Sequence, residues 1–426
     1  MTGAVILGTL AACLATGLSS PHPLSPMPAI AIRAYTATTA VGRGRDAQAS
    51  ALDARRGGLR RNDFGPTPLD TWIGRVDGLE DASAALPPAL ASWECRNNRL
   101  AWLALQHDGL LDAVAAVRDR HGADRVAVVL GTSTASIGES EDAYAHLQAD
   151  GEGRGCFPDD MARPLVHTPH SLGGFVQAAT GLRGPCTTVA TACSSSAKVF
   201  AQAARLIQCG LVDAALVGGV DTLCGSVLFG FNALGLVSAV PCRPFDPARD
   251  GLSLGEAGGF AVLERALPGG TGLQLRGYGE SSDAHHMSAP HPEGLGAGLA
   301  MRDALARAGI AADEVGYLNL HGTATPVNDA VEARAIAELF PDGLHASSTK
   351  GWTGHTLGAA GIVESVFTLL ALRDGVLPGT LHSTVRDPAC GPQVRFDNAR
   401  APGIRYAMNN SFGFGGNNSS LVFGRA

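Results

Sequence analysis

The sequence has few charged residues, few aromatic residues and no cysteines at the spacing of metal ligands. Charged residues make up 17% of the 426 residues and aromatic residues 5%. The 9 cysteines are odd in number and scattered along the chain, which argues against a disulfide framework and against a zinc site. Most of them are expected to be small buried side chains in a protein of the reducing cytoplasm.

An excess of positive charge is also missing. The formal net charge is -7, which argues against a nucleic-acid partner. Arg55, Arg56, Arg60 and Arg61 do form a local cluster of basic residues, so a small basic surface patch is compatible with the sequence.

The apolar stretch at the start of the chain is too short for a membrane span. Residues 1–17 are apolar and no Lys or Arg precedes them, whereas a spanning helix needs about 20 apolar residues. Leu10 to Cys13 resembles a lipoprotein cleavage box. We expect residues 1–28 to be a disordered N-terminal extension, with Met27 as an alternative start.

From residue 29 onward, strand patterns alternate with helix patterns. The continuous apolar run at 125–131 suits a strand buried on both faces. A strand at 187–192, a helix at 194–209 and a strand at 213–218 follow in close succession, which predicts a parallel βαβ unit. We also predict a single helix over 99–121.

The same alternation recurs after residue 272. The patterns predict helices at 298–308, 329–340 and 357–372 and strands at 315–320, 346–349 and 421–424. The chain therefore divides into two similar halves, residues 29–271 and 272–426.

The strongest local motif is T-A-C-S-S-S at residues 191–196. Cys193 is predicted to lie between a buried strand and the start of a helix, where free N–H groups and the helix dipole favour a thiolate. An ordinary buried cysteine followed by a helix N-terminus fits the same pattern.

Two histidines stand in loops that follow strands. His321 begins H-G-T-A-T-P, and His355 lies in S-S-T-K-G-W-T-G-H-T-L-G together with Lys350. A loop after a strand is a common place for ligand-facing histidines, although a structural histidine fits too. A lysine in so apolar a loop needs a carboxylate, for which Glu364 on the next helix is a candidate; otherwise it is a surface lysine.

A glycine- and phenylalanine-rich segment precedes the last strand. Residues 410–418 read N-S-F-G-F-G-G-N-N, which suits a gate or an oxyanion-binding loop. A tight turn before a strand is the simpler alternative.

Together the four motifs resemble those of the elongating β-ketoacyl-acyl-carrier-protein synthases, in the same order and with similar spacing. R-P-F-D-P-A-R-D-G at 243–251 and S-S-D-A-H-H-M at 281–287 add to the resemblance, which extends from about residue 29 to 425. It implies an α/β architecture, the thiolase fold, in which two βαβαβαββ-like halves pack as α-β-α-β-α layers and form a dimer.

The resemblance also implies a role for each motif residue. Cys193 matches the acyl-accepting nucleophile, and His321 and His355 match the pair that holds the thioester carbonyl of the extender unit. The remaining matches are the supporting pair Lys350 and Glu364, the gate residues Phe414 and Phe231, the pantetheine-contacting Thr323 and Thr325, and the supporting acids Asp329 and Glu332. Backbone N–H groups of Cys193 and Phe414 are expected to form the oxyanion hole.

Several consequences follow for partners. The family uses no metal and no cofactor of its own, because phosphopantetheine is carried by the partner acyl carrier protein. The partner subunit is a second copy or a chain-length-factor-like homologue. Gly235 and its neighbours lack the arginine with which many relatives grip the carrier. Residues 69–80 look closer to synthases of aryl-polyene and xanthomonadin-type pigment pathways.

Three alternatives belong to other classes. A non-catalytic chain-length partner shares the fold but lacks the active cysteine, which Cys193 argues against. A serine hydrolase using Ser194 or Ser195 would need a histidine oriented by an aspartate, and no such motif is evident. A thiolase expects a second cysteine near the C-terminus, but the last cysteine is Cys390.

Overall fold

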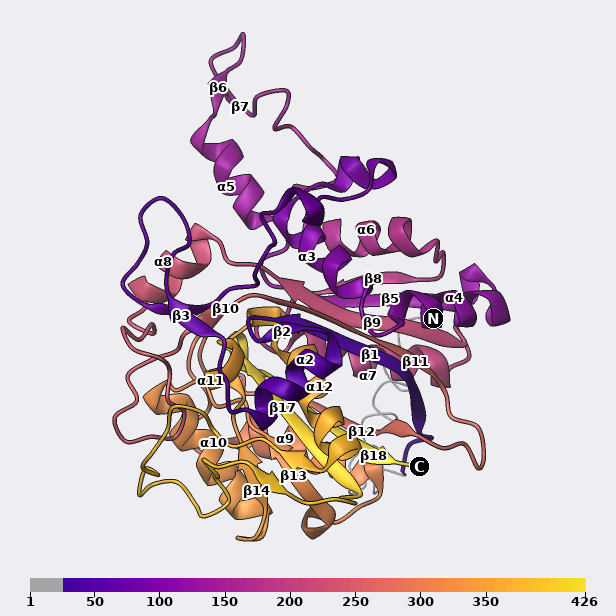
Figure 1. Cartoon of the computed structure of the whole chain (residues 1–426), viewed down its shortest axis with the longest axis vertical. Coiled ribbons are helices and arrows are strands. Elements are labelled where there is room, and N and C mark those ends of the chain that lie inside the picture. Colours follow the sequence, from indigo (N-terminus) through magenta and orange to yellow (C-terminus); the bar gives the residue numbers. More distant parts are fainter. Residues whose placement is uncertain (1–25) are drawn as a thin grey trace, which may run out of the picture.

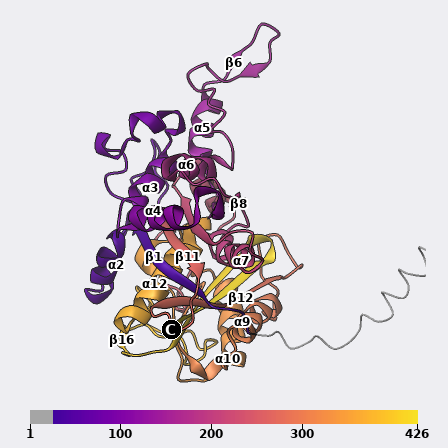
Figure 2. The same cartoon turned by 90° about the vertical axis from the view of Figure 1, so that its right-hand side faces the viewer.

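A computed structural model describes residues 26–426, shown from two sides in Figures 1 and 2. The predicted disordered extension over residues 1–28 therefore lies almost wholly outside the described residues. Of its last part, Met27 donates its backbone N–H to the Arg307 carbonyl over 2.7 Å. No helix in the described range is long and apolar enough to cross a membrane.

Most strands join one mixed sheet of 11 strands in the order β14-β13-β17-β18-β12-β1-β11-β9-β5-β8, with β2 beside β1. These strands are β1 (Ile30–Thr39), β2 (Gly42–Arg43), β5 (Val126–Gly131), β8 (Cys186–Val189), β9 (Ala214–Asp221), β11 (Ala257–Arg265), β12 (Leu273–Ser282), β13 (Val315–Asn319), β14 (His345–Ser347), β17 (Tyr406–Gly413) and β18 (Asn417–Arg425). The two parts of the sheet meet where β1 and β12 pair, at Ile30–Leu275 and Ala31–Gln274.

The helices are α2 (Gly44–Asp53), α3 (Arg96–Leu105), α4 (Leu110–His121), α5 (Ile137–Ala145), α6 (Ser171–Thr180), α7 (Ser195–Gln208), α8 (Gly225–Ala233), α9 (Leu295–Ala308), α10 (Pro326–Leu339), α11 (Lys350–Thr353) and α12 (Ala360–Asp374). Short strands lie outside the main sheet: β3 (Leu59–Arg61), β4 (Trp72–Gly74), β6 (Gln148–Ala149), β7 (Gly155–Cys156), β10 (Leu254–Gly255), β15 (Val376–Leu377) and β16 (Ala399–Arg400).

Packing of the helices divides the molecule into five layers. α7 and α12 share one hydrophobic cluster with β9 and β11 on one side and β17 and β18 on the other. α3, α4 and α6 cover the outer face of the first part of the sheet, and α9 and α10 cover that of the second. The α-β-α-β-α arrangement is thus confirmed. α12 is buried on all sides from Ala360 to Leu372, as expected of a helix between two sheets.

Some sequence-based boundaries were wrong. The single helix predicted over 99–121 is two helices, because Asp108 (φ 59°) and Gly109 (φ 69°) take left-handed conformations between α3 and α4. The strand predicted over 187–192 ends at Val189. The strand predicted over 346–349 ends earlier, and Lys350 begins the single-turn helix α11.

Candidate active site

Cys193 lies in a sharp turn between β8 and α7. Ala192 has a left-handed φ of 52°, and the Ser195 hydroxyl fixes the turn by accepting from the Thr191 N–H (2.9 Å) and donating to the Ala192 carbonyl (2.6 Å). The turn sets the cysteine directly before Ser194, the N-cap of α7, at the strand-to-helix junction predicted from the motif. Its side chain is buried.

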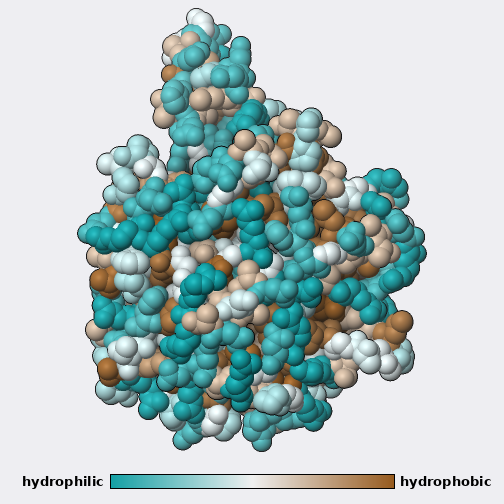
Figure 3. All heavy atoms as spheres, in the orientation of Figure 1, coloured by the Kyte–Doolittle hydropathy of each residue, from teal (hydrophilic) through white to brown (hydrophobic). Residues whose placement is uncertain are grey.

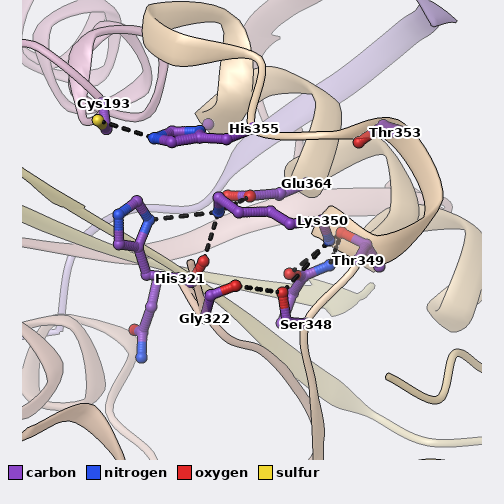
Figure 4. A network of polar contacts seen from close by, with 12 residues as sticks. Cys193, His321, Gly322, Ser348, Thr349, Lys350, Thr353, His355 and Glu364 are labelled. Carbon is purple, nitrogen blue, oxygen red and sulfur yellow. Dashed lines mark hydrogen bonds and ion pairs between the residues drawn. The ribbon is translucent and has the colours of Figure 1, made fainter. Parts of the chain in front are cut away.

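Both predicted histidines converge on this sulfur. The Nε2 atom of His355 lies 3.0 Å from Cys193 Sγ, and the rings of His355 and His321 are 5.5 Å apart in edge-to-face orientation (Figure 4). Sγ and one ring nitrogen from each histidine all lie within 4.8 Å of one another. Residues from three distant motifs therefore share one small volume.

Lys350 and Glu364 form a buried ion pair behind His321. The Lys350 ammonium donates to the Glu364 carboxylate and to the His321 carbonyl, and its Nζ lies 3.4 Å from His321 Nδ1. An ammonium only donates, so His321 Nδ1 is an acceptor and the ring proton sits on Nε2. The pair thus turns the N–H of His321 away from the lysine (Figure 4).

A close helix contact brings this pair beside Cys193. A Cβ at Gly361 would lie 2.3 Å from the backbone nitrogen of Ala197, so only glycine lets α12 pack this closely on the first turn of α7. The Ile362 N–H also donates to the Ser196 hydroxyl over 2.9 Å. Because Glu364 is on α12 and Cys193 precedes α7, this contact sets the spacing of the site.

Two buried carboxylates shape the loop that carries His321. Glu332 accepts the backbone N–H groups of His321 and Gly322, each over 2.8 Å. Asp329 accepts from the N–H groups of Phe245 (2.8 Å) and Ala324 (3.2 Å). Neither carboxylate lines the pocket that leads to Cys193. Both therefore support the loop from the side that faces away from this pocket.

A pocket of about 300 Å³ leads to the three converging residues. Its lining includes Thr323 and Thr325, whose hydroxyls lie 2.9 Å apart. Phe231 of α8 and Phe414 also line it, with stacked rings 5.7 Å apart. The walls are mostly apolar, which suits a flexible thioester arm with few polar groups.

The predicted oxyanion-binding loop approaches the sulfur. The backbone N–H of Phe414 faces the Cys193 thiol. Gly413, one residue earlier, would place a Cβ 3.2 Å from the Cys193 backbone nitrogen and 2.8 Å from the Thr191 carbonyl. The lack of a side chain there lets the loop lie against the nucleophile turn.

Burial dominates the electrostatics of the site. It raises the pKa of Cys193 to about 11, although the Lys350 charge and the Phe414 N–H act in the opposite direction. The thiolate expected from the helix start is therefore not the resting state; the free pocket holds a thiol. Burial also lowers the pKa values of His321 and His355 well below 6.5, so both rings are neutral.

The pKa values of the supporting acids are raised. Burial raises the pKa of Glu364 and of Glu332 to about 7 and that of Asp329 to about 6, despite the hydrogen bonds and cations that favour ionisation. These carboxyls are therefore easy to protonate inside the folded protein.

The sequence motifs missed a further buried acid, Asp221 at the end of β9. It accepts the hydroxyls of Thr132 (2.6 Å) and Thr134 (2.7 Å) and the backbone N–H of Ala359 (3.1 Å). It joins the loop after β5 to the start of α12. No local pattern marks it, because its partners come from segments far apart in the chain.

A second missed pair forms part of the pocket wall. Asp283 accepts the side-chain amide of Asn418 over 2.9 Å. Both residues belong to motifs that support the resemblance, but neither motif by itself points to a contact between them. Gly415 also donates its backbone N–H to the Met287 carbonyl over 2.8 Å, and Asp283 donates its backbone N–H to the Gly416 carbonyl over 3.0 Å, so several hydrogen bonds connect the two loops.

The comparisons with known proteins decide the family. Residues 96–268 match the family described as beta-ketoacyl synthase, N-terminal domain, and residues 273–384 match its C-terminal domain. The chain belongs to the β-ketoacyl synthase family. The synthase is 36% identical over 330 residues to 3-oxoacyl-[acyl-carrier-protein] synthase 2 of Staphylococcus aureus (strain N315), an alignment that covers 74% of this chain and 78% of the relative. It is accordingly an enzyme of the acyltransferase class.

Other relatives agree. The synthase is 37% identical over 335 residues to the mitochondrial 3-oxoacyl-[acyl-carrier-protein] synthase of Arabidopsis thaliana, covering 74% of this chain and 72% of the relative. Among solved structures, it matches a chain of a ketosynthase in complex with its chain length factor from Xenorhabdus doucetiae, with a TM-score of 0.82, 36% identity and coverage of 94% and 98%. A β-ketoacyl synthase from Burkholderia phymatum STM815 gives a TM-score of 0.81 at 29% identity, with coverage of 94% and 100%. The predicted thiolase fold is confirmed.

Proposed function

We propose that the synthase extends acyl chains by decarboxylative condensation at Cys193. One observation carries the proposal: Sγ of Cys193 and ring nitrogens of His321 and His355 lie within 4.8 Å of one another at a pocket with apolar walls. A nucleophile and two neutral N–H donors are the groups that this reaction needs.

The first step is acyl transfer to the sulfur. Sγ attacks the thioester carbonyl of an acyl donor, forms a new S–C bond and breaks the bond to the pantetheine sulfur. The thiol proton passes through His355 Nε2 at 3.0 Å to the leaving thiolate. The backbone N–H groups of Cys193 and Phe414 hold the transient oxyanion.

The second step uses a malonyl thioester. Its terminal C–C bond breaks, CO₂ leaves, and the electron pair moves onto the thioester as an enolate. The Nε2–H groups of His321 and His355 hold the enolate oxygen, and one such donor is worth about 3–4 kcal/mol. The enolate carbon then attacks the acyl-Cys193 carbonyl, and the C–S bond breaks to return the sulfur as a thiolate.

His355 has to accept a proton at Nε2 in the first step and donate a hydrogen bond from Nε2 to the enolate oxygen in the second. Its Nδ1 is buried and has no hydrogen-bond partner in the described part of the chain. No second contact therefore favours one tautomer. Because neither tautomer of His355 is fixed, its Nε2 can act as an acceptor in the first step and as a donor in the second. Lys350, by contrast, holds His321 in the tautomer that donates through Nε2.

The remaining site residues have supporting roles in this proposal. Lys350 and Glu364 orient His321, and Asp329 and Glu332 hold its loop. Thr323 and Thr325 contact the pantetheine arm, and the stacked Phe231 and Phe414 open and close the way to the sulfur. The geometry of each is compatible with its role.

We assign an acyl carrier protein as the partner that delivers both thioesters, with phosphopantetheine on the carrier and no cofactor in the synthase itself. The relatives in Staphylococcus aureus and Arabidopsis thaliana are named as 3-oxoacyl-[acyl-carrier-protein] synthases, which supports this assignment. The partner subunit is either a second copy or a chain-length-factor-like homologue. β8 lies at one end of the sheet order, so one of its edges has no paired strand within residues 26–426. This open edge supports a partner subunit that pairs at β8.

Three finer assignments complete the proposal. The halves at 29–271 and 272–426 each supply part of the catalytic group. The enzyme works in the cytoplasm, because its eight described cysteines are free thiols. The likeness of residues 69–80 to pigment-pathway synthases supports a role in an aryl-polyene or related pathway. The alternative, a non-catalytic chain-length partner, is disfavoured by Cys193 itself.

The decisive test is condensation in vitro. Purified synthase is mixed with malonyl-carrier and a panel of saturated, polyenoic and aromatic acyl-carriers, and products are identified by mass. We expect β-ketoacyl-carrier and CO₂ in equal amounts, with the polyenoic or aromatic primers preferred. Absence of condensation with every primer, alone and with the chain-length-factor homologue added, would refute the proposal.

A further inference from the structure

The catalytic group is also a ligand set for a soft divalent cation. One thiol and two imidazoles are common ligands of zinc and cobalt. All three side chains are buried, with donor atoms within 4.8 Å of one another. Metal–ligand distances near 2.0–2.3 Å place such donors roughly 3.5 Å apart, so shifts on the order of 1 Å would close a site with a fourth position open to the pocket.

The surroundings of the two histidines oppose metal binding. A ligating histidine normally donates its other N–H to a carboxylate, a carbonyl or water. His321 instead turns Nδ1 toward the Lys350 ammonium at 3.4 Å. Binding a metal through Nε2 would move the proton to Nδ1, where it would face another donor. His355 Nδ1 has no acceptor within residues 26–426.

Charge acts in the same direction. The Lys350 ammonium is buried and reaches both the carbonyl and the ring of His321. A dication beside it would feel a repulsion that bulk water does not screen. Glu364 pairs with the lysine through one oxygen, and within residues 26–426 no carboxylate joins the three donor atoms as a ligand.

We propose that Cys193, His321 and His355 form a latent site for a soft divalent cation and that Lys350 keeps this site empty. Lys350 then has a second role beside orienting His321. It prevents a thiol and two imidazoles that could ligate zinc from binding a metal, so that they remain available for the reaction. Metal binding can be followed without turnover, so the inference stands or falls separately from the proposed condensation.

The test is a cobalt(II) titration of the purified protein. The Lys350→Met/Glu364→Gln double variant removes both charges of the pair with little change in shape. We expect it to bind cobalt roughly 10–100-fold more tightly than the wild type, with a thiolate-to-cobalt absorption band that zinc abolishes. Circular dichroism checks folding; if the double variant fails to fold, Lys350→Met alone is used.

Two matched variants make the result specific. Lys198→Met removes the other lysine of the chain, which is half-buried and faces Glu280, and should bind cobalt like the wild type. Cys193→Ser in the double-variant background should lose the band, although the exposed Cys156 and Cys209 remain. Equal affinity of wild type and double variant, or a band that survives Cys193→Ser, overturns the inference.

Discussion

His355 Nε2 lies 3.0 Å from Cys193 Sγ, although the two residues are 162 positions apart in the chain. Burial keeps the imidazole neutral and the thiol protonated. In the proposed reaction, Cys193 is therefore activated by a proton acceptor in contact with it and not by a permanent negative charge. This relationship separates the two chemical steps and makes them testable one by one.

Removing the sulfur should separate transfer from decarboxylation. Cys193→Ala is expected to abolish formation of the acyl-enzyme and of the β-ketoacyl product, because Cys193 is the only cysteine of residues 26–426 that lines the pocket. It should still release CO₂ from malonyl-carrier, since both histidines remain. Intact-protein mass after incubation with acyl-carrier, and CO₂ release, measure the two steps. Cys209→Ala at an exposed cysteine is the control, and an acylated Cys193→Ala protein would contradict the assignment.

Removing either histidine should have the opposite effect on decarboxylation. His321→Ala or His355→Ala takes away one N–H donor to the enolate oxygen, so the rate of CO₂ release should fall about 10²–10³-fold. Acyl transfer should survive better in His321→Ala, because His355 is the residue in contact with the sulfur. Wild-type decarboxylation in both variants would show that these rings do not hold the enolate.

The neutral state of His355 has a consequence for stability at acid pH. Burial, then the Lys350 charge, lowers its pKa well below 6.5 in the folded protein, whereas the unfolded chain protonates near 6.5. Below pH 6.5 the unfolded state therefore binds a proton that the folded state refuses, and stability falls as the pH falls. Other groups titrate in the same range, so the comparison is with His355→Gln.

When the pH falls from 6.5 to 5.5, the free energy of unfolding of the wild type should decrease by about 1 kcal/mol more than that of His355→Gln. Denaturant unfolding at both values, and at pH 7.5 as a baseline, measures this shift. A difference that stays constant with pH would mean that His355 protonates normally in the folded protein.

Local motifs predicted which side chains meet better than they predicted the surroundings of those side chains. Cys193, His321 and His355 each follow a strand and stand in a distinctive motif, so their meeting could be predicted together with the fold. The raised pKa of Cys193 could not, because the depth of its burial depends on α12 packing over α7 at Gly361. A helix start signals a lower pKa, but desolvation is the larger effect here.

Other features had no signal in the sequence. Asp221 is followed by no recognisable motif, and its importance arises only when the loop after β5 and the start of α12 meet around it. The break between α3 and α4 was missed because the apolar pattern continues through Gly109. Left-handed residues such as Asp108 and Ala192 depend on tertiary contacts that a pattern of residue types does not contain.

The last prediction concerns the surface around the pocket mouth. Phe231 and Leu236 line the pocket, and the chain from Gly225 to Cys242, which forms α8 and the turn after it, contains no charged residue. A carrier that feeds its arm to Cys193 must lie against this uncharged surface. Leu234, which is 59% exposed, follows α8 directly.

Leu234→Asp should therefore raise the KM for malonyl-carrier severalfold while leaving the rate with malonyl-pantetheine unchanged, because the short thioester does not touch this surface. A negative charge would both cost apolar contact and repel an acidic carrier. Leu267→Asp is the matched control: Leu267 is 67% exposed and follows the far end of β11. Equal KM values for the two variants, or an equal loss of rate with the carrier and with pantetheine, would place carrier docking elsewhere.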